Sequence, residues 1–270
     1  KIQKQGLTLE KMWDKTEENI SIPATDMEHY AEHPDVIFVC VKGYSLQETI
    51  PFIKRIARKN TIVIPVLNIY GTGGKMQKEL PDLLVTDGCI YVSANIKEPG
   101  KLLQHGQILH IVFGVRDKAE FRPELKEIQK DLCDSHIDGT LSENIRREAL
   151  EKFSYVSPIG AAGLYYHATA ADFQKEGEAR ELFKTLIREI VTLANAMGIT
   201  FEEDLVERNL KILSNLPEEA TTSMQRDVME GKQSEIDGLV YEVVRMAEKY
   251  GAEVPAYRRA AEKFREMGVK

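Results

Sequence analysis

Two polar side chains follow two apolar segments of the sequence and could bind a ligand together. Lys42 comes directly after the run Asp35–Val41, and Asn68 comes directly after the run Thr61–Leu67. If both runs are parallel strands of one sheet, their carboxyl ends lie at the edge where open α/β sheets bind ligands. We therefore expect Lys42 and Asn68 to line a cleft, although lysines also end strands that bind nothing.

The second half of the chain offers a lysine and a carboxylate. Lys152 lies shortly before the small-residue run Gly160–Gly163, which indicates either close helix packing or the close approach of a ligand. Taken alone, Lys152 is typical of a surface lysine. Glu235 and Asp237 are typical of the first turn of a helix capped by Ser234, a position that favours acidic residues.

Two short motifs suggest other chemistry but fit it poorly. His29-Tyr-Ala-Glu-His33 matches the H-x-x-E-H pattern of some zinc hydrolases, yet Pro34 follows at once and disfavours a helix there. A solvated helix end is the simpler interpretation. The glycine-rich stretch Tyr70-Gly-Thr-Gly-Gly-Lys75 lacks both the first glycine and the final Ser/Thr of a phosphate-binding loop. We expect a flexible turn at this stretch.

Four short β-branched runs predict an α/β domain around these residues. They are Asp35–Val41, Thr61–Leu67, Cys89–Ser93 and Ile108–Phe113. The first two are almost continuously apolar, as strands are when helices cover both faces of a sheet. A helix expected over Leu46–Arg58 joins these two as a βαβ unit on a parallel sheet. The last two runs predict antiparallel strands at the sheet edge.

After about residue 140 the strand pattern ends and long helices follow. Apolar residues recur on one helical face over Glu178–Met197 and Glu235–Tyr250, and a further helix is expected from Pro255 to Met267. The predicted fold class is an α/β Rossmann-type parallel sheet domain followed by an all-α helical domain. We place the boundary within Cys133–Leu141, which gives domains of residues 1–138 and 139–270.

Composition and charge exclude several classes of protein. The chain has 36 Lys+Arg and 43 Asp+Glu, a net charge of −7, which disfavours binding to nucleic acid or to anionic membranes. Its longest apolar run is far shorter than the roughly 20 residues of a membrane span. Three scattered cysteines argue against disulfides and a structural zinc site, so we expect a reducing, cytoplasmic location.

The ordered set of motifs resembles the ketopantoate reductase (2-dehydropantoate 2-reductase) family from end to end. Ser223 lies twelve residues before Glu235 in Ser234-Glu-Ile-Asp237, and this spacing is the most diagnostic feature. The other matching stretches are Asp35–Lys42, Pro65–Asn68, Pro99-Gly100 with Gly106 and Gly114, Glu151–Phe153, Ser223–Asp227 with Gly231, and Val254-Pro255.

The resemblance implies an NADPH-dependent oxidoreductase of pantothenate biosynthesis, with a Rossmann-type domain, an all-α domain and an active site in the cleft between them. It implies that Lys152 is the general acid and Glu235 the active-site glutamate, which holds the lysine and lies beside the cofactor. Lys152 and Ser223 would bind the 2-oxo acid substrate. Asn68 would contact both substrate and nicotinamide, Lys42 would line the cofactor side, and Ile96 would offer a backbone contact to the cofactor.

Three departures from the family pattern bear on function. The strand, G-x-G-x-x-G turn and helix that open the family sequence, and the arginine for the 2′-phosphate, do not occur before Lys1–Glu10. We expect that the natural sequence continues upstream or that the chain holds NADPH poorly. Asparagines four and eight residues after the catalytic lysine are here Val156 and Gly160, and the family's N-G-x-G is here Asn68-Ile-Tyr-Gly71.

Three functions remain open on sequence grounds. The first is NADPH-dependent reduction of 2-dehydropantoate or of a different branched 2-oxo acid. The expected partners are then the small-molecule substrate and a second copy of the chain, with which it would form a homodimer. The second is a non-catalytic homologue that acts as a binding or regulatory protein. A zinc hydrolase that uses His29 and His33 is a distant third.

Overall fold

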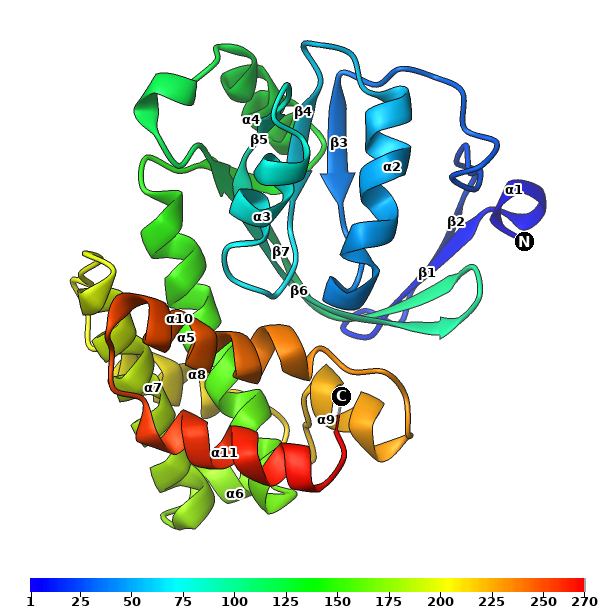
Figure 1. Ribbon diagram of the computed structural model, residues 1–270. Helices are drawn as coiled ribbons and strands as arrows, with labels where there is room; N and C mark the ends of the chain where they lie inside the picture. The colour runs from blue at the N-terminus through cyan, green and yellow to red at the C-terminus, as the bar shows by residue number, and fades with distance from the viewer. Residues whose placement is uncertain (270) are drawn as a thin grey trace. The chain divides into compact units, whose positions relative to one another are not determined.

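A computed structural model describes residues 1–269, which fall into two compact units (Figure 1). The α/β unit comprises Lys1–Cys40, Gln47–Val66 and Thr72–Ile145. The helical unit comprises the chain from Arg146 onward together with two short segments, Val41–Leu46 and Leu67–Gly71. These two segments carry Lys42 and Asn68, so both residues belong with the helices rather than with the strands that precede them.

A three-stranded parallel sheet forms one part of the α/β unit. Its order is β3 (Val36–Val39), β4 (Ile62–Pro65) and β5 (Leu84–Val85). Helix α2 (Leu46–Ile56) connects β3 to β4, which confirms the predicted βαβ unit. All four residues of β4 are buried, as its unbroken apolar sequence requires.

The second sheet of the α/β unit is mixed. Strands β6 (Asp87–Glu98) and β7 (Lys101–Gly114) form the predicted antiparallel pair but are much longer than the two apolar runs. Strand β1 (Leu7–Lys11) pairs in parallel with β7 and antiparallel with β2 (Glu17–Ile20). The short elements beside these strands are α1 (Ile2–Gln5), η2 (Lys118–Glu120) and α4 (Glu124–Asp134).

Strand β8 (Asp138–Leu141) lies in the segment that we predicted to hold the domain boundary. It pairs in parallel with β7, so the α/β unit continues as far as Ile145. The domain limits of residues 1–138 and 139–270 stay a prediction. The predicted fold class is confirmed: a parallel-dominated α/β domain is followed by a helical domain.

The glycine-rich stretch is not the flexible turn that we predicted, because it begins helix α3 (Thr72–Glu79). The buried Asp87 carboxylate accepts hydrogen bonds from the backbone N–H groups of Gly73 and Gly74. A Cβ atom on Gly73 would overlap this carboxylate and the carbonyl of Thr86. Burial raises the pKa of Asp87, although Arg116, 3.4 Å away, and the two N–H groups favour its charged form. A side chain of the protein itself therefore occupies the N-terminus of α3.

The helical unit begins with the long helix α5 (Ile145–Tyr166), which includes Pro158. The other helices are α6 (Ala170–Gln174), α7 (Glu178–Ala196), α8 (Leu205–Leu213), α9 (Ser223–Met229), α10 (Glu242–Tyr250) and α11 (Pro255–Glu266). The predicted helices over Glu178–Met197 and Pro255–Met267 are confirmed by α7 and α11. The predicted helix over Glu235–Tyr250 is interrupted by η3 (Asp237–Tyr241), a π-helical turn.

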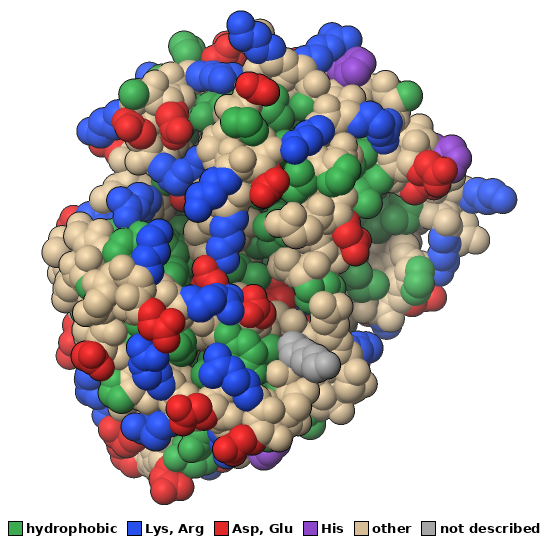
Figure 2. Space-filling model, viewed as in Figure 1, with side chains coloured by type: hydrophobic (Ala, Val, Ile, Leu, Met, Phe, Trp, Pro, Cys, Tyr) green, Lys and Arg blue, Asp and Glu red, His purple; other side chains and the backbone are tan. Residues whose placement is uncertain are grey.

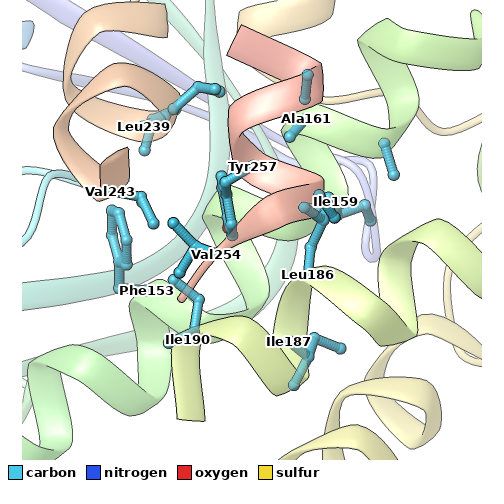
Figure 3. Close-up of a cluster of buried hydrophobic side chains, with 14 of the residues drawn as sticks. Phe153, Ile159, Ala161, Leu186, Ile187, Ile190, Leu239, Val243, Val254 and Tyr257 are labelled. Carbon is cyan, nitrogen blue, oxygen red and sulfur yellow. The ribbon is translucent and has the colours of Figure 1, made fainter. Parts of the chain in front are cut away.

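Buried apolar side chains of α5, α7, α10 and α11 form the core of the helical unit. Figure 3 shows Phe153, Ile190, Val254 and Tyr257 within this cluster. The buried carboxylate of Glu189 accepts hydrogen bonds from Ala256 N at 2.7 Å and Tyr257 N at 2.9 Å. This carboxylate binds the N-terminus of α11 to α7, so polar contacts as well as apolar packing hold the helices together.

The surface carries charges of both signs. On the face drawn in Figure 2, basic side chains (blue) are interspersed with acidic ones (red). Within residues 1–269, no helix combines the length and the apolar composition that crossing a membrane requires.

The Asp87 contacts predict a stability effect. Replacing Asp87 by Ala leaves two helix N–H groups and the Arg116 guanidinium without their buried acceptor. We expect this to lower the free energy of unfolding by about 2–4 kcal/mol, measured by urea denaturation. Asp117→Ala is the matched control, because Asp117 also caps a helix, at Ala119 N, but is exposed. An equal loss in both variants would contradict the assignment to burial.

Candidate functional site

Lys42 and Asn68 follow equivalent ends of neighbouring strands, as predicted. Val39 at the end of β3 pairs with Pro65 at the end of β4, and each polar residue comes three positions later. Gly43–Ser45 forms a short 3₁₀ helix, η1, directly after Lys42. Both side chains therefore belong to segments of the helical unit that follow the two strands in sequence.

Glu235 is not an exposed residue of a helical first turn. Its side chain is only 4 % exposed, and one oxygen, Oε1, accepts a hydrogen bond from Gly43 N at 3.0 Å. The other oxygen, Oε2, lies 3.3 Å from Lys42 Nζ. Asp237, in contrast, forms an exposed ion pair with Arg245 at 2.8 Å, as its place on the helix surface predicts. The two carboxylates of one motif thus have different roles.

Lys42 is shared between two carboxylates. Besides its contact with Glu235, Lys42 Nζ donates a hydrogen bond to Oδ2 of Asp227, a residue of α9, at 3.1 Å. Partial burial of the ammonium opposes its charge, but the attraction of Glu235 and Asp227 outweighs burial and raises the pKa of Lys42 above its ordinary value. Lys42 is therefore charged at neutral pH and links the segment Val41–Leu46 to two other segments of the helical unit.

Lys152 lies on α5 and donates to Asn68 Oδ1 at 2.7 Å. The turn of α5 that carries it is held by the buried Asn209 of α8, whose Nδ2 donates to the Ser154 carbonyl at 2.9 Å and to its Oγ at 3.1 Å. We predicted that Glu235 holds Lys152. The contacts of Glu235 described above are with Lys42 and Gly43, so its role toward Lys152 stays a prediction.

Ser223 is the first residue of α9 and is half-buried. Its contact with the substrate stays a prediction. The start of α9 is fixed by a capping box, in which Thr222 and Gln225 bond each other's backbone N–H groups. It is also fixed by packing, since a Cβ atom on Gly160 would lie 3.1 Å from Met224 Cε.

Glycines on α5 serve helix packing, one of the two interpretations that the sequence left open. A Cβ atom on Gly163 would lie 2.5 Å from Gln225 Oε1, so α9 requires a bare backbone there. On the α5 face that begins at Lys152, the positions four and eight residues later are Val156 and Gly160. That face is therefore apolar for about 12 Å beyond the lysine.

The remaining predicted residues lie elsewhere. Ile96 is on β6 of the α/β unit and is 72 % exposed; its predicted backbone contact to a cofactor stays a prediction. We predicted that His29 and His33 lie at a helix end, and this is wrong. His29 lies in a turn and His33 in the irregular chain that follows it. His29 contacts Asp26 at 2.6 Å, and His33 contacts the carbonyl of Ile56 at 2.8 Å. Within residues 1–269 no cluster of three metal-ligating side chains occurs.

Sequence reasoning missed two participants in these contacts. Asp227 was part of a recognised motif but was not predicted to bind Lys42. Gly43 contributes only a backbone N–H, which no residue type reveals. Its position directly after Lys42 was the available signal, because glycine permits close approach of another group.

Two models of one family match almost the whole chain. "Ketopantoate reductase PanE/ApbA" matches residues 1–118, and "Ketopantoate reductase PanE/ApbA C terminal" matches residues 144–267. The chain belongs to the ketopantoate reductase family. It is therefore an oxidoreductase by family, with a Rossmann-type domain followed by a helical domain.

Individual members of the ketopantoate reductase family are distant. A 2-dehydropantoate 2-reductase of Aquifex aeolicus is 21 % identical over 86 % of this chain and 76 % of its own length. A ketopantoate reductase structure from Ralstonia eutropha has a TM-score of 0.86 at 20 % identity, over 98 % of this chain and 85 % of that one. D-mandelate dehydrogenase with NADH and anilino(oxo)acetate has a TM-score of 0.83 at 18 % identity, over 97 % and 84 %. These likenesses show the fold and leave the substrate open.

The contacts of Lys42 predict a pH dependence of stability. Because its pKa is raised on folding, the stabilisation is complete below the ordinary lysine value of 10.5 and is lost as the pH rises through the folded value. We expect Lys42→Met to lower the free energy of unfolding by about 1–3 kcal/mol at neutral pH, since it leaves the buried Glu235 without its cation.

Thermal unfolding of Lys42→Met and wild type between pH 7 and 11 measures this difference. The difference between the two curves should narrow as the pH rises above 10.5. Lys211→Met is the control, because Lys211 is an exposed residue of α8 and its loss should leave the curve unchanged. A difference for Lys42→Met that persists unchanged to pH 11 would contradict this account.

Proposed function

We propose that the protein is a nicotinamide-dependent reductase of 2-oxo acids, and that it converts 2-dehydropantoate to pantoate with NADPH in pantothenate and coenzyme A biosynthesis in the cytoplasm. The observation that carries the proposal is the Lys152–Asn68 contact of 2.7 Å, in which the ammonium is positioned by an asparagine that lies three residues after strand β4. Membership of the ketopantoate reductase family supports the same reaction class.

The chemistry needs a proton donor at the substrate carbonyl. As a hydride adds to C2, the carbonyl electron pair moves to oxygen, which then takes a proton from Lys152 Nζ and gives a 2-hydroxy acid. Asn68 Oδ1 accepts from the same ammonium and so orients it. The Ser223 hydroxyl would hydrogen-bond the substrate. Lys152 then recovers its proton from solvent.

The residues of this chain fit the nicotinamide end of a dinucleotide. Lys42 and Asn68 follow neighbouring parallel strands, where such cofactors bind, and with Glu235 they would hold that end. The G-x-G-x-x-G turn that would receive the pyrophosphate does not occur in residues 1–270. When bound, the cofactor supplies the hydride.

A second substrate class has specific support. The first turn of α5 beyond Lys152 carries Val156, which offers no hydrogen bond to a substrate hydroxyl, and one turn further Met224 packs against Gly160. A 2-oxo acid with a branched or aromatic hydrocarbon side chain would suit this face better than hydroxylated 2-dehydropantoate. The fold shared with D-mandelate dehydrogenase, whose substrate carries a phenyl ring, is compatible with this alternative.

Oxidation of NADPH and NADH by the full-length protein, followed at 340 nm, tests the proposal. The panel consists of 2-dehydropantoate, 2-oxoisovalerate and phenylglyoxylate. The highest kcat/KM with 2-dehydropantoate and NADPH is the expected result, and preference for either hydrocarbon acid would support the second class. No oxidation with any member would favour the non-catalytic homologue and refute the enzyme proposal.

Lys152→Ala should lower kcat by about 10²–10⁴, the usual scale for a positioned proton donor. The melting temperature and the dissociation constant for NADPH should change little, because the lysine faces the substrate side. Lys211→Ala, an exposed lysine of α8, is the control and should keep full turnover. Near-normal turnover of Lys152→Ala would show that it is a surface lysine.

A further inference from the structure

The side chain of Ile69 lies between two glycines of separate segments of the helical unit. A Cβ atom on Gly43, in η1, would overlap Ile69 Cδ1 and lie 3.5 Å from Cγ1. A Cβ atom on Gly238, in the π-turn η3, would also overlap Cδ1 and lie 2.6 Å from Cγ1 and 3.0 Å from Cγ2. Ile69 therefore fits only because both facing positions lack a side chain.

Gly43 takes part in a polar contact of the candidate site, and Gly238 lies close to Glu235 in the sequence. Gly43 donates its N–H to Glu235 Oε1, and a Cβ atom on Gly43 would lie only 3.7 Å from that oxygen. Gly238 follows Glu235 by three residues. Ile69 itself directly follows Asn68, the partner of Lys152.

We propose that Ile69 is a positioning residue that fixes the Lys152–Asn68 pair relative to the Glu235–Lys42 pair. Its β-branched side chain has few rotamers, so contact with two bare backbones leaves the loop of residues 67–71 little freedom. The π-turn contributes by presenting the backbone of Gly238 to this side chain, and such turns are frequent at functional sites.

The expected effect of Ile69 on catalysis rests on the proposed function, whereas its packing between Gly43 and Gly238 does not. A smaller residue at position 69 would let Asn68 and the Gly43 amide move independently. Displacements of about 1 Å at a reacting group can lower a rate about 10²-fold. The effect would fall on kcat and to a smaller extent on KM for the cofactor, because Asn68 is also proposed to hold the nicotinamide end while Lys42 keeps its ion pairs with Asp227 and Glu235.

A size exchange tests the proposal. Ile69→Ala and Gly43→Ala are each expected to lower kcat about 10–100-fold with the best substrate of the panel, with less than about threefold change in KM for the cofactor. In the double variant the new methyl group enters the space that Ile69 leaves, so kcat should recover at least about tenfold over Gly43→Ala. Ile212→Ala, which truncates an exposed isoleucine of α8, should keep the wild-type kcat.

Two results would overturn the proposal. One is a kcat of Ile69→Ala within about twofold of wild type; the other is a double variant whose loss of kcat equals the product of the losses of the two single variants. A readout without substrate separates this failure from failure of the proposed function. In ¹H–¹⁵N NMR spectra, Ile69→Ala should shift both the Gly43 amide and the Asn68 side-chain amide, and Ile212→Ala should shift neither. Unchanged signals for either group would refute the positioning role even if the protein reduces no 2-oxo acid.

Discussion

A carboxylate removed from water must find both a cation and hydrogen-bond donors, and Glu235 meets this requirement across a long stretch of sequence. One carboxylate oxygen accepts a hydrogen bond from Gly43 N, 192 residues earlier in the chain, and the other lies beside the ammonium of Lys42, 193 residues earlier. The same lysine reaches Asp227, so α9 is drawn into the arrangement. The placement of η1, the π-turn and α9 all depends on this one buried charge, and Ser223 at the start of α9 depends on it indirectly.

The pattern of apolar residues in the sequence predicted the helices and strands that bury one or both faces. It did not predict the elements whose conformation depends on polar contacts. Strand β4 and helices α7 and α11 follow their sequence periodicity closely. Helix α3 begins with Thr72-Gly-Gly, a sequence of low helix propensity, and its stabilising cap, Asp87, comes from another element. The π-turn was invisible because the apolar residues of Glu235–Tyr250 keep a helical spacing through it.

For the candidate site, residue types were predictable and partners were not. Lys42, Asn68, Lys152, Ser223 and Glu235 were all singled out from motif spacing, and the structure places all five in the helical unit. The pairing of Lys42 with Glu235, and of Lys152 with Asn68, required the tertiary fold. Neither a backbone donor such as Gly43 nor the apolar side chain of Ile69 carries a chemical signature in sequence.

The crowding around Ile69 also constrains how this loop can diverge. With isoleucine at position 69, a Cβ atom at position 43 or at position 238 would overlap its side chain, so the three positions constrain one another. A side chain gained at position 43 or 238 should therefore accompany a smaller residue at position 69.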